Sequence, residues 1–298
     1  MLNHIIHERR VTMRTEKEMM NLIINVAETN ERIRAVYMNG SRTNPNVPTD
    51  KYQDYDIIYI VTEMDWFYKN KDWISVFGEF VMVQEPDKNS IAEGEKIDIS
   101  DSYGWLMLFK DGNRIDLHIE TMNENYEYGE DKLTITLLDK DNVLPQLPPP
   151  SDIDYHIKKP TEGQYVSATN NFWWCLQNVA KGIARDELTY AMNMYLQVVH
   201  EKLESMIKWH IGINYNFSVN VGPWGKWFKK YLPKNLYILY LKTYSNANYE
   251  NLWNAIFSAC ELFRIIAPIV GNELGYTYNK QEDDNMTEYL TKIRDDTV

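Results

Sequence analysis

The spacing of apolar residues along the chain changes in character at about residue 150. Before that point, short apolar runs between polar turns predict strands, together with one amphipathic helix at residues 16–28. After it, apolar residues recur at intervals of three and four, which predicts helices. The proline-rich residues 144–150 interrupt regular structure and stiffen the chain. We therefore expect an α+β fold with one domain at residues 1–150 and an all-α domain at residues 151–298.

The same pattern predicts the individual elements. In the first domain the predicted strands are residues 33–38, 57–61, 79–84, 103–110 and 114–120. A short helix is predicted at residues 72–77, and the polar residues 87–102 are predicted to be a loop. In the second domain the predicted helices are residues 162–183, 188–211, 223–232, 236–244, 249–267 and 282–294. Pro268 is expected to end the fifth of these helices.

Composition and charge narrow the classes of partner. The chain of 298 residues carries a net charge of −12, and the first 150 residues hold 27 acidic against 16 basic side chains. A nucleic-acid backbone requires the opposite sign, so we expect no nucleic-acid partner. An acidic half suits a cationic substrate, although acidity also serves solubility alone. No apolar run approaches 18 residues, so we expect no membrane span.

The cysteines and the N-terminus indicate the compartment. Cys175 and Cys260 lie in apolar, helix-like contexts and form neither a disulfide framework nor a metal cluster, which favours a reducing cytoplasm. The N-terminus has no apolar segment typical of a signal peptide. Met13 is a candidate start, which would make residues 1–12 an extension. We expect a monomer by default.

The candidate chemistry lies between residues 35 and 61. Asp54 and Asp56 lead into an apolar strand and, being two residues apart, point to the same side. Two such carboxylates repel each other unless a divalent cation lies between them. Gly40 permits close approach of a ligand, and Ser41 offers a hydroxyl and an amide to a phosphate. An isolated Asp-x-Asp is more often a pair of loop carboxylates, but the nearby Gly-Ser and strands favour a magnesium and phosphate site.

A third carboxylate, Asp116, lies between apolar residues on the predicted strand 114–120. Transfer of a nucleotidyl group needs a divalent ion at the triphosphate and a group that accepts the proton of the attacking hydroxyl. Asp116 fits either role, as third ligand or as base, and the sequence does not decide between them. The plain alternative is a solvent-exposed aspartate. His118 shares its face and fits a supporting or surface position better than a catalytic one.

Several segments together resemble one family. They are Tyr-Met-Asn-Gly-Ser-Arg-Thr-Asn-Pro at 37–45, Gln-Asp-Tyr-Asp-Ile at 53–57, Arg-Ile-Asp-Leu at 114–117, Asn-Asn-Phe-Trp-Trp at 170–174 and Val-Ala-Lys-Gly-Ile-Ala-Arg-Asp-Glu at 179–187. In this order they resemble the bacterial aminoglycoside 6-adenylyltransferases, also called streptomycin adenylyltransferases, from about Met13 onward. The Gly-Ser and Asp-x-Asp part is common to all nucleotidyltransferases.

The resemblance implies a polymerase-beta-like nucleotidyltransferase domain followed by a helical substrate-binding bundle. It implies transfer of AMP from ATP to a hydroxyl of streptomycin, the 6-hydroxyl in this family, with release of pyrophosphate and antibiotic resistance. The residues it assigns are Asp54, Asp56 and Asp116 for Mg²⁺ and catalysis, and Gly40, Ser41, Arg42 and Lys181 for the nucleotide.

The guanidinium groups of streptomycin suit carboxylates and aromatic rings. Asp186 and Glu187 are candidate carboxylates, and Trp173 and Trp174 are candidate rings. Tryptophans on an apolar helix more often belong to the core, and the acidic pair equally fits a helix start. The competing interpretations are a nucleotidyltransferase that acts on a protein or RNA, and a binding module without activity. The acidic charge argues against RNA, and the intact carboxylates argue against an inactive module.

Overall fold

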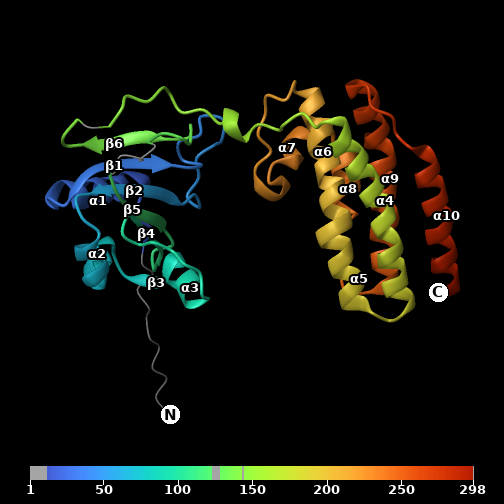
Figure 1. Cartoon of the computed structure of the whole chain (residues 1–298), viewed down its shortest axis with the longest axis horizontal. Coiled ribbons are helices and arrows are strands. Elements are labelled where there is room, and N and C mark those ends of the chain that lie inside the picture. The colour runs from blue at the N-terminus through green and yellow to red at the C-terminus, as the bar shows by residue number, and fades with distance from the viewer. Residues whose placement is uncertain (1–11, 123–127, 143, 298) are drawn as a thin grey trace, which may run out of the picture. The chain divides into compact units, whose positions relative to one another are not determined.

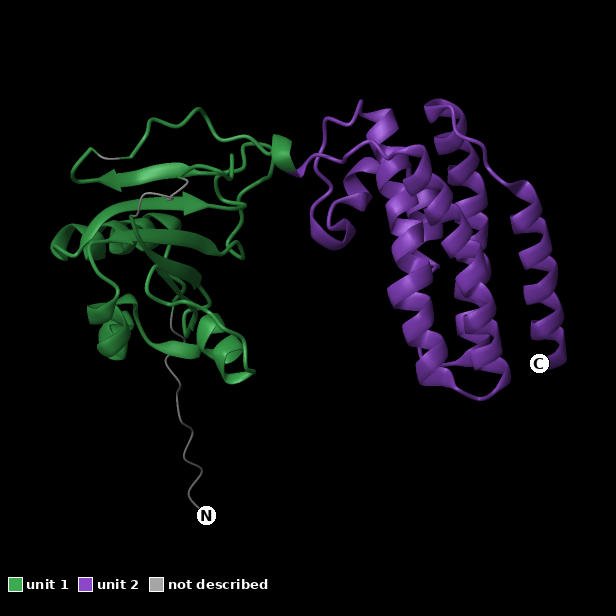
Figure 2. Cartoon of the chain, viewed as in Figure 1, with its two compact units in different colours: residues 1–154 green, residues 155–298 purple. Residues whose placement is uncertain are grey.

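The computed structural model describes residues 12–122, 128–142 and 144–297. It divides the chain into two compact units, residues 1–154 and residues 155–298 (Figure 2). The first unit contains a mixed sheet with short helices, and the second is built of helices (Figure 1). Each unit is described by itself.

The described part of the first unit forms a six-stranded sheet with the order β3-β4-β5-β2-β1-β6. Its strands are β1 (Ile33–Asn39), β2 (Tyr55–Val61), β3 (Phe80–Gln84), β4 (Ser102–Phe109), β5 (Arg114–Thr121) and β6 (Ile135–Asp139). β2 and β5 pair in parallel, whereas the other neighbouring strands pair antiparallel. The sheet is therefore mixed.

The two faces of this sheet differ in polarity. Along β5, Ile115, Leu117 and Ile119 are fully buried, whereas the alternate residues from Arg114 to Glu120 are only half-buried. The buried face packs with helix α1 (Glu16–Thr29) in the larger of the unit's apolar clusters. The period of two thus directs the polar residues of β5 to the opposite face, which carries the candidate chemistry.

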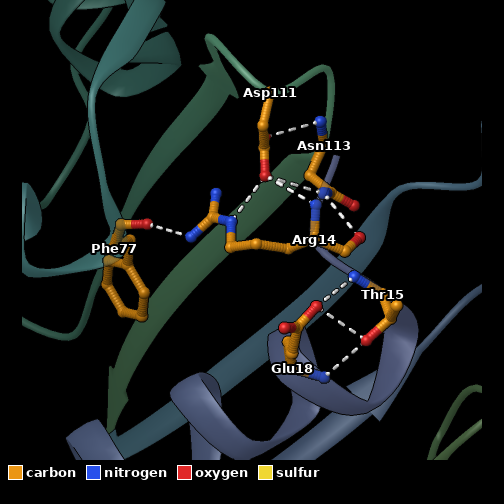
Figure 3. Close-up of polar contacts among 6 residues, drawn as sticks. All are labelled: Arg14, Thr15, Glu18, Phe77, Asp111 and Asn113. Atoms are coloured by element: carbon orange, nitrogen blue, oxygen red, sulfur yellow. Dashed lines mark hydrogen bonds and ion pairs between the residues drawn. The ribbon is translucent and has the colours of Figure 1, made fainter. Parts of the chain in front are cut away.

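Arg14 joins the start of α1 to the β4–β5 hairpin (Figure 3). Its Nε donates to Asp111 Oδ2 at 2.5 Å, and its Nη1 donates to the carbonyl oxygen of Phe77 at 2.6 Å. Burial alone would raise the pKa of Asp111, but its hydrogen bonds with Arg14 and Asn113 hold that pKa well below its usual range. A capping box between Thr15 and Glu18 closes the first turn of α1.

Besides α1, the helices of the first unit are α2 (Asp65–Lys69), η1 (Lys71–Phe77) and α3 (Pro86–Ala92). Those of the second unit are η2 (Ile153–Tyr155, which spans the division), α4 (Glu162–Ala184), α5 (Leu188–Met194), η3 (Tyr195–Val199), α6 (His200–Asn214), η4 (Pro223–Gly225), α7 (Phe228–Tyr231), α8 (Lys234–Leu241), α9 (Tyr249–Leu274) and α10 (Lys280–Thr297). In Figure 1, α4, α6, α9 and α10 form the long body of this bundle.

Helix α9, with 26 residues, contributes many buried side chains to the second unit. By length and composition it is apolar enough to cross a membrane, but 56% of its most apolar window is buried inside the bundle. Its buried side chains, including Phe263 and Ile266, belong to the apolar core of the unit. The apolar character of α9 is therefore accounted for by packing within the bundle.

The structure differs from the prediction at several elements. The helix predicted at residues 223–232 is two short helices, η4 and α7, because Trp224 has a positive φ of 56°. Helix α2 was not predicted. Residues 86–92 form α3, because Pro86 occupies the first helical turn, where a missing N–H costs nothing. Strand β6 was not predicted, since its five residues depend on pairing with β1 at the sheet edge. Pro268 lies inside α9 and does not end it, because the following turn is held by buried Val270 and Gly271.

Candidate active site

The carboxylates Asp56 and Asp116 lie next to each other on neighbouring strands. Asp56 of β2 is in register with Asp116 of β5, and on its other side Asp56 is in register with Asn39 of β1. Residues in register on adjacent strands share one face and lie about 5 Å apart. Asp54 directly precedes β2, two residues before Asp56. The sheet thus brings Asp56 and Asp116 together, although they are far apart in sequence.

The backbone of Gly40 lies next to the row of carboxylates formed by Asp56 and Asp116. Gly40 has a φ of +79°, and a Cβ at this position would lie 2.0 Å from Asp56 Oδ2. Any side chain would therefore displace the Asp56 carboxylate, and the positive φ independently favours glycine. The Gly-Ser turn and the Asp-x-Asp pair, predicted to act together, are in direct contact.

Ser41 and Arg42 tie this turn to the residues before β2. The side-chain amide of Gln53 donates to Ser41 O at 3.2 Å and to Ser41 Oγ at 3.3 Å. Arg42 Nε donates to the carbonyl oxygen of Asp54 at 3.0 Å, and its Nη2 donates to that of Gln53 at 2.8 Å. These bonds fix the segment that carries Asp54.

The side chain of Arg42 is 3% exposed, and its guanidinium lies 3.8 Å from the ring centre of Tyr55. Its Nε and Nη2 are directed at backbone carbonyls and its Nη1 lies 3.6 Å from Glu16 Oε2, so the guanidinium is engaged within the protein, and its contact with a nucleotide stays a prediction. The structure gives Arg42 the role of holding the loop in place.

Arg114 was not among the predicted site residues. Its Nε donates to Asp116 Oδ1 and its Nη2 to Asp116 Oδ2, both at 2.7 Å, and its Nη1 lies 3.3 Å from Asp54 Oδ2. The sequence held one signal for this contact, because residues 114 and 116 share a strand face. A guanidinium thus joins two of the three candidate carboxylates.

The electrostatics of the row are most visible at Asp56. Burial raises the pKa of its carboxyl group to about 6, with further increases from the negative charges of Asp116 and Asp54. The nearby cations Arg114 and Arg42 act in the opposite direction but do not cancel these effects. Negative charge at Asp56 is therefore only partly compensated, as expected where a cation is to be bound.

Carboxylate oxygens at Asp54, Asp56 and Asp116 are the hard donors that Mg²⁺ prefers, so the residue types fit this ion. Among the described residues, no three or more acidic, histidine or cysteine side chains are placed as a complete ligand set. Asp116 instead directs both of its oxygens to Arg114. Each Asp116 oxygen keeps a second lone pair, so the bonds from Arg114 occupy part of the acceptor capacity that a metal ion or a proton would use.

The candidate residues of the helical unit have different environments. Lys181 is exposed in the last turn of α4, and Asp186 and Glu187 follow in the turn to α5. Asp186 adopts a φ of 60° and accepts a hydrogen bond from Tyr249 OH at 2.7 Å, while the N–H of Glu187 donates to the carbonyl oxygen of Gly182. These three candidates therefore gather at one end of α4, and Asp186 is partly engaged in the turn.

Trp173 lies in the core of the helical unit. Its ring is 2% exposed and packs edge-on against Phe172 and Phe263. A ring in this position offers no face to a ligand, so the structure corrects the expectation of a substrate contact. The neighbouring Trp174 is 63% exposed, because successive helical residues point about 100° apart.

Comparisons with known proteins extend over nearly the whole chain. Residues 13–293 match the family model described as streptomycin adenylyltransferase. Among curated relatives, an aminoglycoside 6-adenylyltransferase of Campylobacter jejuni is 36% identical, covering 94% of this chain and 96% of the relative. Proteins of the same name from Bacillus subtilis and Staphylococcus aureus are 35% and 33% identical, covering 94% and 91% of this chain and 98% and 95% of the relatives.

A solved structure of an aminoglycoside 6-adenyltransferase from Bacillus subtilis is 30% identical to this chain. The match covers 95% of this chain and 99% of that one, with a TM-score of 0.46.

Proposed function

The chain belongs to the streptomycin adenylyltransferase family, and we propose on this premise that it transfers AMP from ATP to the 6-hydroxyl of streptomycin. The hydroxyl oxygen bonds to the α-phosphorus, the bond from this phosphorus to pyrophosphate breaks, and the hydroxyl loses its proton. The modified antibiotic would lose activity, so the function is resistance. The observation that supports this proposal most strongly is the row of Asp56 and Asp116 beside Gly40.

In this proposal, Asp54 and Asp56 hold Mg²⁺ together with the nucleotide. The bound ion would neutralise the triphosphate and stabilise the charge that develops during transfer. Gly40 lets the backbone approach the phosphates, and Ser41 offers its hydroxyl and amide to them. The bonds from Gln53 and Arg42 keep this turn and Asp54 in fixed relative positions.

Asp116 takes one of two roles, general base for the acceptor hydroxyl or third ligand. Its place in register with Asp56 suits both. A base needs access to the proton, and both Asp116 oxygens are bonded to Arg114 in the structure. The role of Asp116 therefore depends on where the Arg114 guanidinium lies when the nucleotide is bound.

The helical unit is proposed to bind the acceptor. Asp186 and Glu187 supply carboxylates to the guanidinium groups of streptomycin, and Lys181 contributes a cation to the triphosphate. Residues 1–150 would act as the nucleotidyltransferase domain and residues 151–298 as the substrate-binding domain. We propose a monomeric enzyme in the cytoplasm, where ATP is available.

A pyrophosphate-release assay with streptomycin, ATP and Mg²⁺ tests the proposal. The native protein should release pyrophosphate, and Asp56→Asn should reduce the rate at least about 100-fold while the fold is retained. The matched control is Asp65→Asn, since the Asp65 side chain is 77% exposed and pairs only with Lys69 among the described residues. Full activity of Asp56→Asn would remove Asp56 from the mechanism.

A further inference from the structure

The guanidinium of Arg114 lies between the carboxylates of Asp54 and Asp116 and supplies positive charge to both. Two of its nitrogens bind both oxygens of Asp116 at 2.7 Å, and the third lies 3.3 Å from Asp54 Oδ2. This fork geometry is the one in which a guanidinium binds carboxylate and phosphate groups most strongly. One side chain thus serves as counter-charge for the carboxylate that precedes β2 and for the carboxylate on β5.

The exposure of Arg114 differs from that of the other arginine near the site. The Arg42 side chain is 3% exposed and bonded to two backbone carbonyls, whereas the Arg114 side chain is 41% exposed. The guanidinium of Arg114 pairs with Asp54 and Asp116, both through their side chains. Movement of Arg114 therefore breaks no backbone bond of the loop or sheet, in contrast to movement of Arg42.

The same contacts restrict what Asp116 can do. Both carboxylate oxygens of Asp116 accept a hydrogen bond from Arg114, so one lone pair of each oxygen is occupied, and the adjacent positive charge weakens Asp116 as a metal ligand or a base. Asp116 is also the less exposed partner, with 17% of its side chain accessible against 41% for Arg114. The arginine is therefore the partner better placed to move.

We propose that Arg114 is a displaceable cation that positions the nucleotide. In the resting chain it neutralises Asp54 and Asp116. When the nucleotide enters with its metal ion, the guanidinium transfers to phosphate oxygens and frees the oxygens of Asp116. This inference rests on the proposed nucleotidyl transfer and adds a residue to it.

Binding measurements without any acceptor test this role through two readouts. The first is the affinity of the protein for Mn²⁺ alone, measured by electron paramagnetic resonance. The second is the affinity for ATP in the presence of Mg²⁺, measured by calorimetry. In Arg114→Gln the competing cation is removed from the carboxylates, so Mn²⁺ should bind about tenfold more tightly. The phosphate contact is lost as well, so ATP should bind at least about tenfold more weakly.

Two further variants sharpen the test. Arg114→Lys keeps the charge but not the fork, so Mn²⁺ affinity should stay near that of the native protein while ATP affinity falls. The matched control is Arg34→Gln, because Arg34 of β1 forms the same kind of fork with Asp141, which follows β6. Both affinities of Arg34→Gln should equal those of the native protein.

Opposite changes of the two affinities in Arg114→Gln would support the proposal. Weaker binding of both Mn²⁺ and ATP would show that Arg114 only maintains the shape of the site, and would overturn it. Unchanged affinities would overturn it as well. A native protein that binds no ATP with Mg²⁺ would contradict the proposed function itself, whereas failure of the Arg114 variants alone leaves that function intact.

Discussion

The α-carbon of Gly40 lies so close to the carboxylate of Asp56 that a Cβ on Gly40 would be 2.0 Å from Asp56 Oδ2. This contact joins the loop after β1 to the start of strand β2. It means that the position of the central carboxylate depends on the absence of a side chain at residue 40. The Gly-Ser turn and the Asp-x-Asp pair, which the sequence predicts to act together, are therefore in direct contact.

Gly40→Ala should therefore abolish most of the activity. The added methyl group displaces Asp56, and a misplacement of about 1 Å can reduce a rate about 100-fold. The positive φ of +79° adds a destabilisation of about 1 kcal/mol. Pyrophosphate release and chemical denaturation measure the two effects.

Gly94→Ala is the control for this prediction. Gly94 has a φ of +99°, but no atom lies within 4 Å of the position that a Cβ would take there. This variant should lose a similar amount of stability and keep its activity within about twofold. Equal activity losses in both variants would show that backbone strain, and not contact with Asp56, limits the rate.

The pH dependence of stability should report the charge at Asp56. The pKa of Asp56 is about 6 in the folded chain, against an ordinary value of 3.8 for an aspartate. Its contribution to stability is therefore fully present below pH 3.8 and is lost as the pH rises through 6. In chelator-treated protein, the free energy of unfolding relative to Asp56→Asn should fall by about 1–3 kcal/mol between about pH 4 and pH 7.

Urea denaturation of both proteins across this pH range measures the difference. The stability of Asp56→Asn relative to the native protein should therefore increase as the pH rises from about 4 to about 7. A pH-independent difference between the two proteins would show that Asp56 titrates normally.

Arg42 should contribute to stability through its backbone contacts. Arg42→Lys loses the bonds to the carbonyl oxygens of Gln53 and Asp54 and the stacking on Tyr55. We expect a loss of about 1–3 kcal/mol in the free energy of unfolding. Arg32→Lys is the control, because Arg32 stacks on Trp66 and pairs with Glu63 at an exposed position. Its effect should stay within about 0.5 kcal/mol, and an equal effect of both variants would contradict the role of Arg42.

The adjacent tryptophans of α4 should respond differently to removal. Trp173→Ala leaves a cavity beside Phe172 and Phe263 and should cost about 3–5 kcal/mol of stability. Trp174→Ala removes a ring that is 63% exposed and should change stability by less than about 0.5 kcal/mol. Thermal unfolding of the two variants decides this, and a stable Trp173→Ala protein would place the ring outside the core.

The alternation of apolar and polar residues was sufficient to predict which residues of β5 lie on the polar face of the sheet. The alternation along β5 indicated that Asp116 faces away from the core, and the structure puts it in register with Asp56. The pairing of β5 with β2 joins segments that are distant in sequence. The family resemblance implied this pairing, but the local pattern of residues does not determine it. The five-residue strand β6 escaped prediction for the same reason, because its pairing with β1 is a tertiary effect.

The contacts of the individual arginines could not be predicted from the sequence. Arg42 binds the backbone carbonyls of Gln53 and Asp54, whereas Arg114 binds the side-chain carboxylates of Asp54 and Asp116. Which group each reaches depends on how the loop before β2 folds against the sheet. Likewise, Trp173 and Trp174 are chemically identical neighbours, and only the packing of α4 against α9 decides which is buried.

The most direct test of the account is mass spectrometry of streptomycin after incubation with the protein, ATP and Mg²⁺. Kanamycin, gentamicin and spectinomycin serve as parallel acceptors, and Asp56→Asn serves as the inactive control. The account predicts streptomycin heavier by one AMP, with pyrophosphate released, only in the reaction with intact Asp56. Unmodified streptomycin from a protein that binds ATP with Mg²⁺ would contradict it and would direct attention to another acceptor, beginning with proteins.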